Sequence, residues 1–83
     1  MKTINRLNVA DHLLEYQFSL IGKTMADAVK DETWIVGWTL TPEQYEEFKA
    51  YAIPLLKKVF KCNTNKAKKT FEWFNLQFGL QVL

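Results

Sequence analysis

The sequence predicts an all-α fold, a compact bundle of three main helices with one further short helix. Two observations carry this prediction. Apolar residues recur at intervals of three and four over most of the chain, as on the buried face of an amphipathic helix. Glycine and proline are scarce, with 3 and 2 residues among 83, so few positions break these patterns. The length allows one domain, residues 1–83, whose small core depends on aromatic packing.

The first main helix is expected over residues 8–21, after a polar and frayed lead-in at residues 1–7. Asn8 is a candidate N-cap, and Asp11 stands three residues later, where it completes a capping box. Gly22 ends this helix, because glycine accepts the left-handed conformation of a helix C-terminus.

A short helix over residues 25–30 follows, because Thr24 and Asp27 repeat the start pattern. The stretch Trp34–Trp38 is ambiguous. Its composition suits a short strand, but no convincing partner strand is found elsewhere, and a lone strand leaves its backbone polar groups unsatisfied. We therefore expect a buried connector whose two tryptophans fill the core.

Thr-Pro-Glu-Gln at residues 41–44 is the strongest local pattern in the chain. The threonine caps a helix, the proline takes its first position and the glutamine closes a capping box. This long helix is expected over residues 42–62. Pro54 lies inside it and removes one backbone hydrogen bond, so a kink or a break is expected near residues 50–54.

The last main helix is expected over residues 65–78, after a turn at Asn63–Asn65. Gly79 ends it, and Leu80 folds back onto its apolar face. The tail at residues 81–83 is too short to be an independent element. The apolar stripe of this helix is about 40° wide and consists of Ala67, Phe71, Phe74 and Phe78.

The net charge of +2 hides an asymmetry along the chain. Residues 1–47 carry a net charge of −4, and residues 48–83 carry +6. The second part suits either solvated helix faces or a phosphate-bearing or acidic partner. Its basic residues are all lysines, which weakens a specific nucleic-acid hypothesis, because arginine is the bidentate reader of phosphate and guanine.

The residue types that carry catalysis are few. His12 is the only histidine, and its neighbour Asp11 does not face it on a helix. Cys62 is the only cysteine and falls in phase with an apolar stripe, so it is expected to be a buried small hydrophobe. We therefore expect a protein that is not an enzyme, with no catalytic residues, no cofactor and no metal.

The back of the last helix carries the main candidate for function. Trp73 lies about 120° from the centre of the apolar stripe, and Leu76 lies nearly opposite it, with Lys66 and Lys69 nearby. If exposed, these four residues form a lysine-rimmed aromatic anchor, as in a protein-binding hot spot or a base-stacking platform. The alternative is that a second internal surface covers Trp73 and Leu76.

Nucleic-acid binding is the alternative function. The segment from Leu55 to Leu80 has the length and order of a helix-turn-helix, although any two helices joined by a polar turn share this likeness. The residues that would approach nucleic acid are Lys57, Lys58, Lys61, Asn65, Lys66, Lys68 and Lys69.

Four segments between Leu13 and Val82 are distinctive: Ser19–Thr24, Trp34 with Trp38, Thr39–Glu47 and Phe74–Leu80. In these segments the chain resembles small uncharacterised accessory proteins of tailed bacteriophages. The resemblance brings no catalytic residues. It implies a protein that binds and modulates or inhibits a host or defence protein.

The chain has no apolar run near the roughly 18–20 residues that cross a bilayer, and its start lacks the apolar stretch of a secretory signal. We expect a cytoplasmic protein without a membrane partner, in the host cytoplasm if a phage encodes it. The sequence leaves open whether the apolar tail makes a homodimer.

Overall fold

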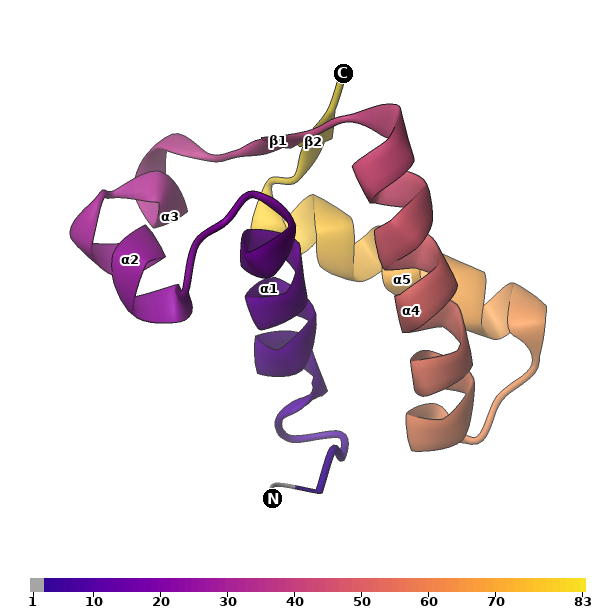
Figure 1. Cartoon of the computed structure of the whole chain (residues 1–83). Coiled ribbons are helices and arrows are strands. Elements are labelled where there is room, and N and C mark those ends of the chain that lie inside the picture. Colours follow the sequence, from indigo (N-terminus) through magenta and orange to yellow (C-terminus); the bar gives the residue numbers. More distant parts are fainter. Residues whose placement is uncertain (1–2) are drawn as a thin grey trace.

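The computed structural model describes residues 3–83, apart from the side chain of Trp34, and residues 1–2 of the predicted lead-in lie outside this range. It confirms the all-α prediction (Figure 1). The helices are α1 (Val9–Leu20), α2 (Met25–Lys30), α3 (Thr33–Val36), α4 (Pro42–Phe60) and α5 (Thr64–Phe78). The β-structure of the described residues is limited to two short strands, β1 (Thr39–Leu40) and β2 (Gln81–Val82).

The core lies between α1, α4 and α5, where α5 crosses behind α4 in Figure 1. Phe18, Phe48 and Phe71 are its largest buried side chains. The rings of Phe48 and Phe71 lie 5.0 Å apart, and Tyr16 stacks on Tyr51 at 4.0 Å. Such pairs contribute about 0.5–1.5 kcal/mol each beyond the burial of their area. Aromatic packing therefore supplies much of this small core.

The start of α1 differs from the prediction in its capping. Asn8 takes the N-cap position, but its side chain caps no N–H of the helix. Its Oδ1 instead accepts a hydrogen bond from the N–H of Asn5 at 2.8 Å, and its Nδ2 donates to the carbonyl of Thr3 at 2.9 Å. Asn8 thus organises a turn over residues 5–8 and makes no capping box with Asp11.

The two other predicted capping boxes form. The hydroxyl of Thr24 accepts from the N–H of Asp27 at 3.1 Å, and the Asp27 carboxylate accepts from the N–H of Thr24 at 3.2 Å. Thr41 and Gln44 make the same pair of bonds at 3.1 and 2.9 Å. The helix stop at Gly22 is also confirmed, since this residue has a φ of +75°.

The predicted buried connector before β1 is only partly correct. Trp38 is buried, and its indole N–H donates to Oε1 of the buried Gln17 at 3.0 Å. Ile35 and Val36 instead belong to the single helical turn of α3 and are exposed, so this part of the connector is not buried. The side chain of Trp34 lies outside the described residues.

The partner strand that the sequence does not reveal is the C-terminal tail. β1 and β2 pair in parallel, with Thr39 opposite Gln81 and Leu40 opposite Val82. The N–H of Leu83 donates to the carbonyl of Leu40 at 3.0 Å. The tail, predicted to be too short for an independent element, therefore forms a strand only by pairing with β1, where each two-residue strand satisfies backbone groups of the other.

α4 is continuous through Pro54, so the proline does not break the helix. Pro54 and Ala50 are both exposed, and water can therefore hydrogen-bond the carbonyl that the proline leaves without a helical donor. A kink at Pro54 stays a prediction. The helix ends at Phe60, before the predicted residue 62, because Lys61 adopts the left-handed conformation with a φ of +51°.

α5 begins one residue earlier than predicted, because Oδ1 of Asn63 accepts from the N–H of Lys66 at 2.8 Å and caps the helix. Its predicted end at Gly79 is confirmed, with a φ of +75°. The N–H of Leu80 donates to the carbonyl of Asn75 at 3.1 Å, and the Leu80 side chain packs against the core as expected.

The buried face of α5 is rotated away from the predicted stripe. Ala67 and Phe71 are buried as expected, but Phe74 and Phe78 are only half-buried, and Asn75 is buried in their place. Packing against α4 sets this rotation, since the ring of Phe71 meets those of α4 residues.

Candidate functional site

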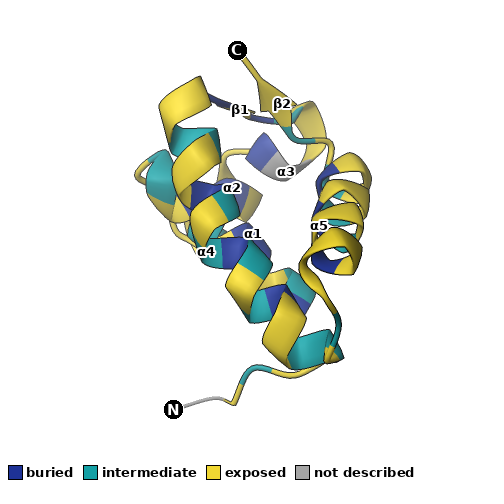
Figure 2. Ribbon diagram, turned by 90° about the vertical axis from the view of Figure 1, so that its right-hand side faces the viewer, coloured by how far each residue is buried: buried dark blue, intermediate teal, exposed yellow. Residues whose placement is uncertain are grey.

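The outer face of α5 carries the predicted protein-binding residues. Figure 2 shows buried residues on the side of α5 that faces the other helices and exposed residues on the opposite side. Trp73 is 57% exposed and Leu76 is 76% exposed, with exposed Lys66 and Lys69 on the same helix. This exposure decides the question that the sequence leaves open, because a second internal surface would have buried Trp73 and Leu76.

The Trp73 side chain is exposed to solvent, but it also packs against a neighbouring aromatic ring. Its ring meets Phe74 edge-on, with centroids 5.3 Å apart. Phe74 stacks on Phe78 at 5.8 Å and lies 6.5 Å from Phe60 of α4. A shallow hollow of about 200 Å³ beside the indole is lined by Trp73, Lys66, Lys69 and Thr70. Phe74, itself stacked on Phe78, thus packs against the indole, and more than half of Trp73 stays exposed to solvent.

A second surface lies where α4 ends and α5 begins. Three lysines predicted to bind nucleic acid, Lys57, Lys58 and Lys61, are exposed there. They line a hollow of about 590 Å³, and its other walls are formed by Ile53, Pro54, Cys62 and Thr64. The lining of this hollow therefore combines three lysines with apolar residues.

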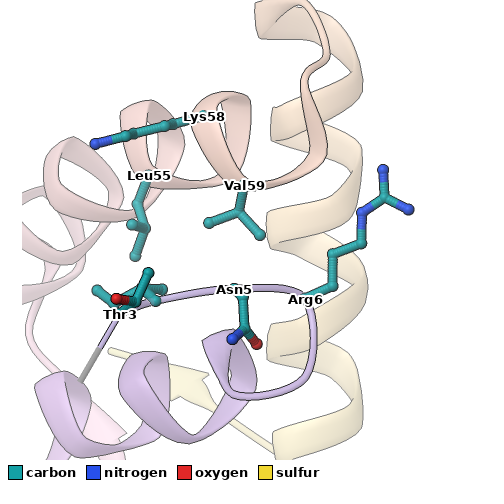
Figure 3. Close-up of a pocket in the computed structure, with 7 residues that line it drawn as sticks. Thr3, Asn5, Arg6, Leu55, Lys58 and Val59 are labelled. Carbon is teal, nitrogen blue, oxygen red and sulfur yellow. The ribbon is translucent and has the colours of Figure 1, made fainter.

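Arg6 joins these lysines although it lies far from them in the sequence. Its guanidinium is 5.7 Å from the centroid of the Phe60 ring, which is a cation–π geometry. Arg6 and Lys58 also line a second hollow of about 460 Å³, whose walls include Leu55 and Val59 (Figure 3). We call the four cations the basic pole, and they are Arg6, Lys57, Lys58 and Lys61.

Sequence reasoning missed Arg6. Its place beside α4 follows from the turn that Asn5 and Asn8 organise, and no local pattern announces that turn. The basic pole therefore includes the guanidinium that the lysine-rich part of the sequence lacks.

The basic pole has no carboxylate partner among the described residues. The only ion pair within the described part of the chain joins Lys23 and Asp31 at 3.1 Å, and it lies beside α2, away from the basic pole. Glu72 is the only acidic residue after residue 47. Burial, followed by the charge of Glu72, raises the pKa of Tyr45, near the start of α4, so the two side chains lie in the same region. Roughly 18 Å of helix separates Tyr45 from Lys57, at 1.5 Å per residue. The positive charge of the pole is therefore left to solvent or to a ligand.

The residues predicted to bind nucleic acid fall into separate groups. Lys57, Lys58 and Lys61 line the hollow at the end of α4, whereas Lys66 and Lys69 line the hollow beside Trp73. The two remaining residues, Asn65 and Lys68, are exposed on α5 and line neither hollow.

The side chains considered for catalysis lie apart. Half-buried His12 lines a hollow of about 190 Å³, together with Glu15, Tyr16, Ser19 and Tyr51. Cys62 lies beyond the end of α4 and is half-buried, with its Sγ 3.9 Å from the carbonyl oxygen of Leu56. In the part of the chain that the structure describes, no three His, Cys, Asp or Glu residues gather as metal ligands.

Comparison with known proteins adds no family. No protein-family model, no curated protein and no solved structure matches the chain. Among the described helices, none has the length and apolar character needed to cross a membrane. The outer face of α5 and the basic pole are therefore the two candidate functional surfaces.

Proposed function

We propose that this protein is a non-enzymatic binding module that docks onto another protein through the outer face of α5. The observation that carries the proposal is the 57% exposure of Trp73 on a well-supported helix. Tryptophan is among the residues most enriched at the energetic centres of protein interfaces, because it offers a large contact area with few rotatable bonds. The folded core gains little from leaving such a side chain in water.

The residues around Trp73 define the chemistry of the partner. Leu76 extends the apolar contact. Lys66 and Lys69 lie beside the indole and form no ion pair within the part of the chain that the structure describes. A complementary surface has an apolar hollow for the indole and carboxylates around it. Stable interfaces bury about 800 Å² on each partner, so contacts extend beyond these four side chains.

The resemblance to small accessory proteins of tailed bacteriophages supports a particular class of partner. It favours a protein of the infected cell, including a defence protein, that the chain meets in the host cytoplasm. Docking of this kind inhibits or modulates the partner by covering its surface and requires no reaction on the chain itself.

The proposal is tested by affinity capture from a nuclease-treated bacterial lysate, with wild-type protein, Trp73→Ala and Ile35→Ala. Ile35 is a matched control because it is a large apolar residue that is 78% exposed on α3. We expect Trp73→Ala to lose the captured protein and Ile35→Ala to retain it, since an aromatic hot spot contributes about 2 kcal/mol or more. Unchanged capture by Trp73→Ala contradicts the proposal.

Light scattering of the purified chain covers the case of self-association. A wild-type dimer that Trp73→Ala converts to a monomer would make a second copy of this chain the partner. Material that is captured from an untreated lysate and entirely absent from the nuclease-treated one would instead favour nucleic acid as the ligand.

A further inference from the structure

The proposed docking face leaves the basic pole unused. From its charge and shape we infer that the basic pole binds the phosphate backbone of single-stranded nucleic acid. This site consists of Arg6, Lys57, Lys58 and Lys61, none of which belongs to the protein-binding set on the outer face of α5. The inference is therefore independent of the proposed function.

The basic pole combines two kinds of cation that suit a phosphate. Arg6 offers a planar guanidinium, which binds phosphate oxygens with two parallel hydrogen bonds. The ring of Phe60 holds this guanidinium at 5.7 Å, so less side-chain freedom is lost when a phosphate binds. Lys57 and Lys58 in the last turn of α4, and Lys61 directly after it, add further point charges.

The cations of the basic pole are also available to a ligand. Among the described residues, no carboxylate forms an ion pair with any member of the basic pole. Counterions gathered around a nucleic-acid backbone are released when such cations replace them, and this release drives binding. A pole already neutralised by carboxylates would gain much less from a phosphate.

The shape of the basic pole also suits a nucleic-acid strand. The two hollows share Lys58, so they form adjoining depressions around this residue. In Figure 3, the side chains of Lys58 and Arg6 extend in opposite directions, with Leu55 and Val59 between them. Cations at both ends of an apolar wall suit a ligand in which anionic groups alternate with flat, less polar groups.

Single-stranded nucleic acid has this alternation, with phosphates along its backbone and bases that turn away from water. A duplex stacks its bases inside and is read by an element that protrudes into a groove. The basic pole is hollowed and has an apolar wall, so the flexible single strand is the better match.

The inference is tested by fluorescence anisotropy with a labelled oligothymidylate of about 20 nucleotides at low salt. Wild-type protein is compared with Arg6→Gln/Lys58→Gln and with Lys30→Gln/Lys49→Gln, which removes the same charge away from the pole. We expect a loss of about tenfold or more in the first variant and about twofold in the control. The slope of log affinity against log salt should become shallower by about 1.4 in the first variant, at about 0.7 per phosphate.

A second variant guards against misfolding caused by losing the Arg6–Phe60 contact. Lys57→Gln/Lys61→Gln changes only exposed side chains, and we expect it to weaken binding by a similar factor with an unchanged circular dichroism spectrum. Trp73→Ala should leave oligonucleotide affinity within about twofold of wild type, because surface substitutions away from a site change little.

Three results would overturn the inference. One is the absence of oligothymidylate binding at low salt. Another is an equal loss of affinity in the control variant, which would mean that only the overall charge matters. The third is preferred binding to a duplex of the same length that Lys66→Gln/Lys69→Gln abolishes, because this would assign the phosphate contacts to α5.

Discussion

The two faces of α5 hold large aromatic side chains in opposite environments. Phe71 on the inner face is 1% exposed, with its ring 5.7 Å from that of Tyr45 and 5.0 Å from that of Phe48. Trp73, only two residues later, is 57% exposed and meets Phe74 by its edge. A helix turns about 200° over two residues, so its phase alone separates them. The inner face serves folding, and the outer face is available for binding.

The comparison predicts its largest effect at Phe71. Phe71→Ala should lower the free energy of unfolding by about 3–5 kcal/mol, because it opens a cavity among buried rings. Native domains have only about 5–15 kcal/mol in total, so this loss is a large fraction of the stability of the fold. Urea unfolding followed by circular dichroism measures the change. A loss below about 1 kcal/mol would contradict the assignment of this face to the core.

The inner face of α5 also contains a buried polar residue that lowers the free energy of unfolding. Asn75 is 8% exposed, and neither its Nδ2 nor its Oδ1 forms a hydrogen bond of good geometry with the described residues, although the amide lies near the Tyr45 hydroxyl. Burying an amide without a partner costs about 1–3 kcal/mol, so Asn75→Leu should raise the free energy of unfolding by about 1 kcal/mol. Lower stability in this variant would show that the amide is satisfied in solution, for example by a bound water.

A pH effect is expected where Tyr45 of α4 packs against this inner face. Burial, followed by the carboxylates of Glu72 and Glu46, raises the pKa of Tyr45 above its usual value of 10.0, and the nearby Asn75 amide opposes the rise. The unfolded chain therefore loses this proton first as the pH increases. The free energy of unfolding should fall above about pH 10.

Unfolding curves at several pH values above about 9 measure this decline. Tyr45→Phe is the matched control, because it keeps the ring and removes the ionisable hydroxyl. We expect a shallower decline in this variant, and the same decline in both proteins would be inconsistent with a raised pKa at Tyr45.

The parts of the fold that the sequence predicts are those determined within a few residues. The capping boxes of Thr24 and Thr41 each join residues three apart, so their patterns are readable without tertiary structure. The stops at Gly22 and Gly79 depend on one residue with a positive φ. Asn8 shows the limit of such reasoning, because a competing turn in the lead-in takes the side chain that would have capped α1.

The parts that the sequence does not predict depend on distant partners. Strands of two residues carry almost no periodic signal, so the pairing of β1 with β2 is visible only in three dimensions. Helical phase places Trp73 and Leu76 off the apolar stripe, but their exposure depends on what packs against α5. The arrival of Arg6 at the end of α4 likewise depends on how the lead-in folds.

The stability of Trp73→Ala tests the central claim most directly, since the claim is that the outer face of α5 is not needed for folding. The account predicts a loss of about 1 kcal/mol or less, because more than half of the side chain is in water and alanine has the higher helix propensity. Urea unfolding measures it beside Phe71→Ala. A loss of about 3 kcal/mol or more, equal to that of Phe71→Ala, would assign Trp73 to the core and contradict the account.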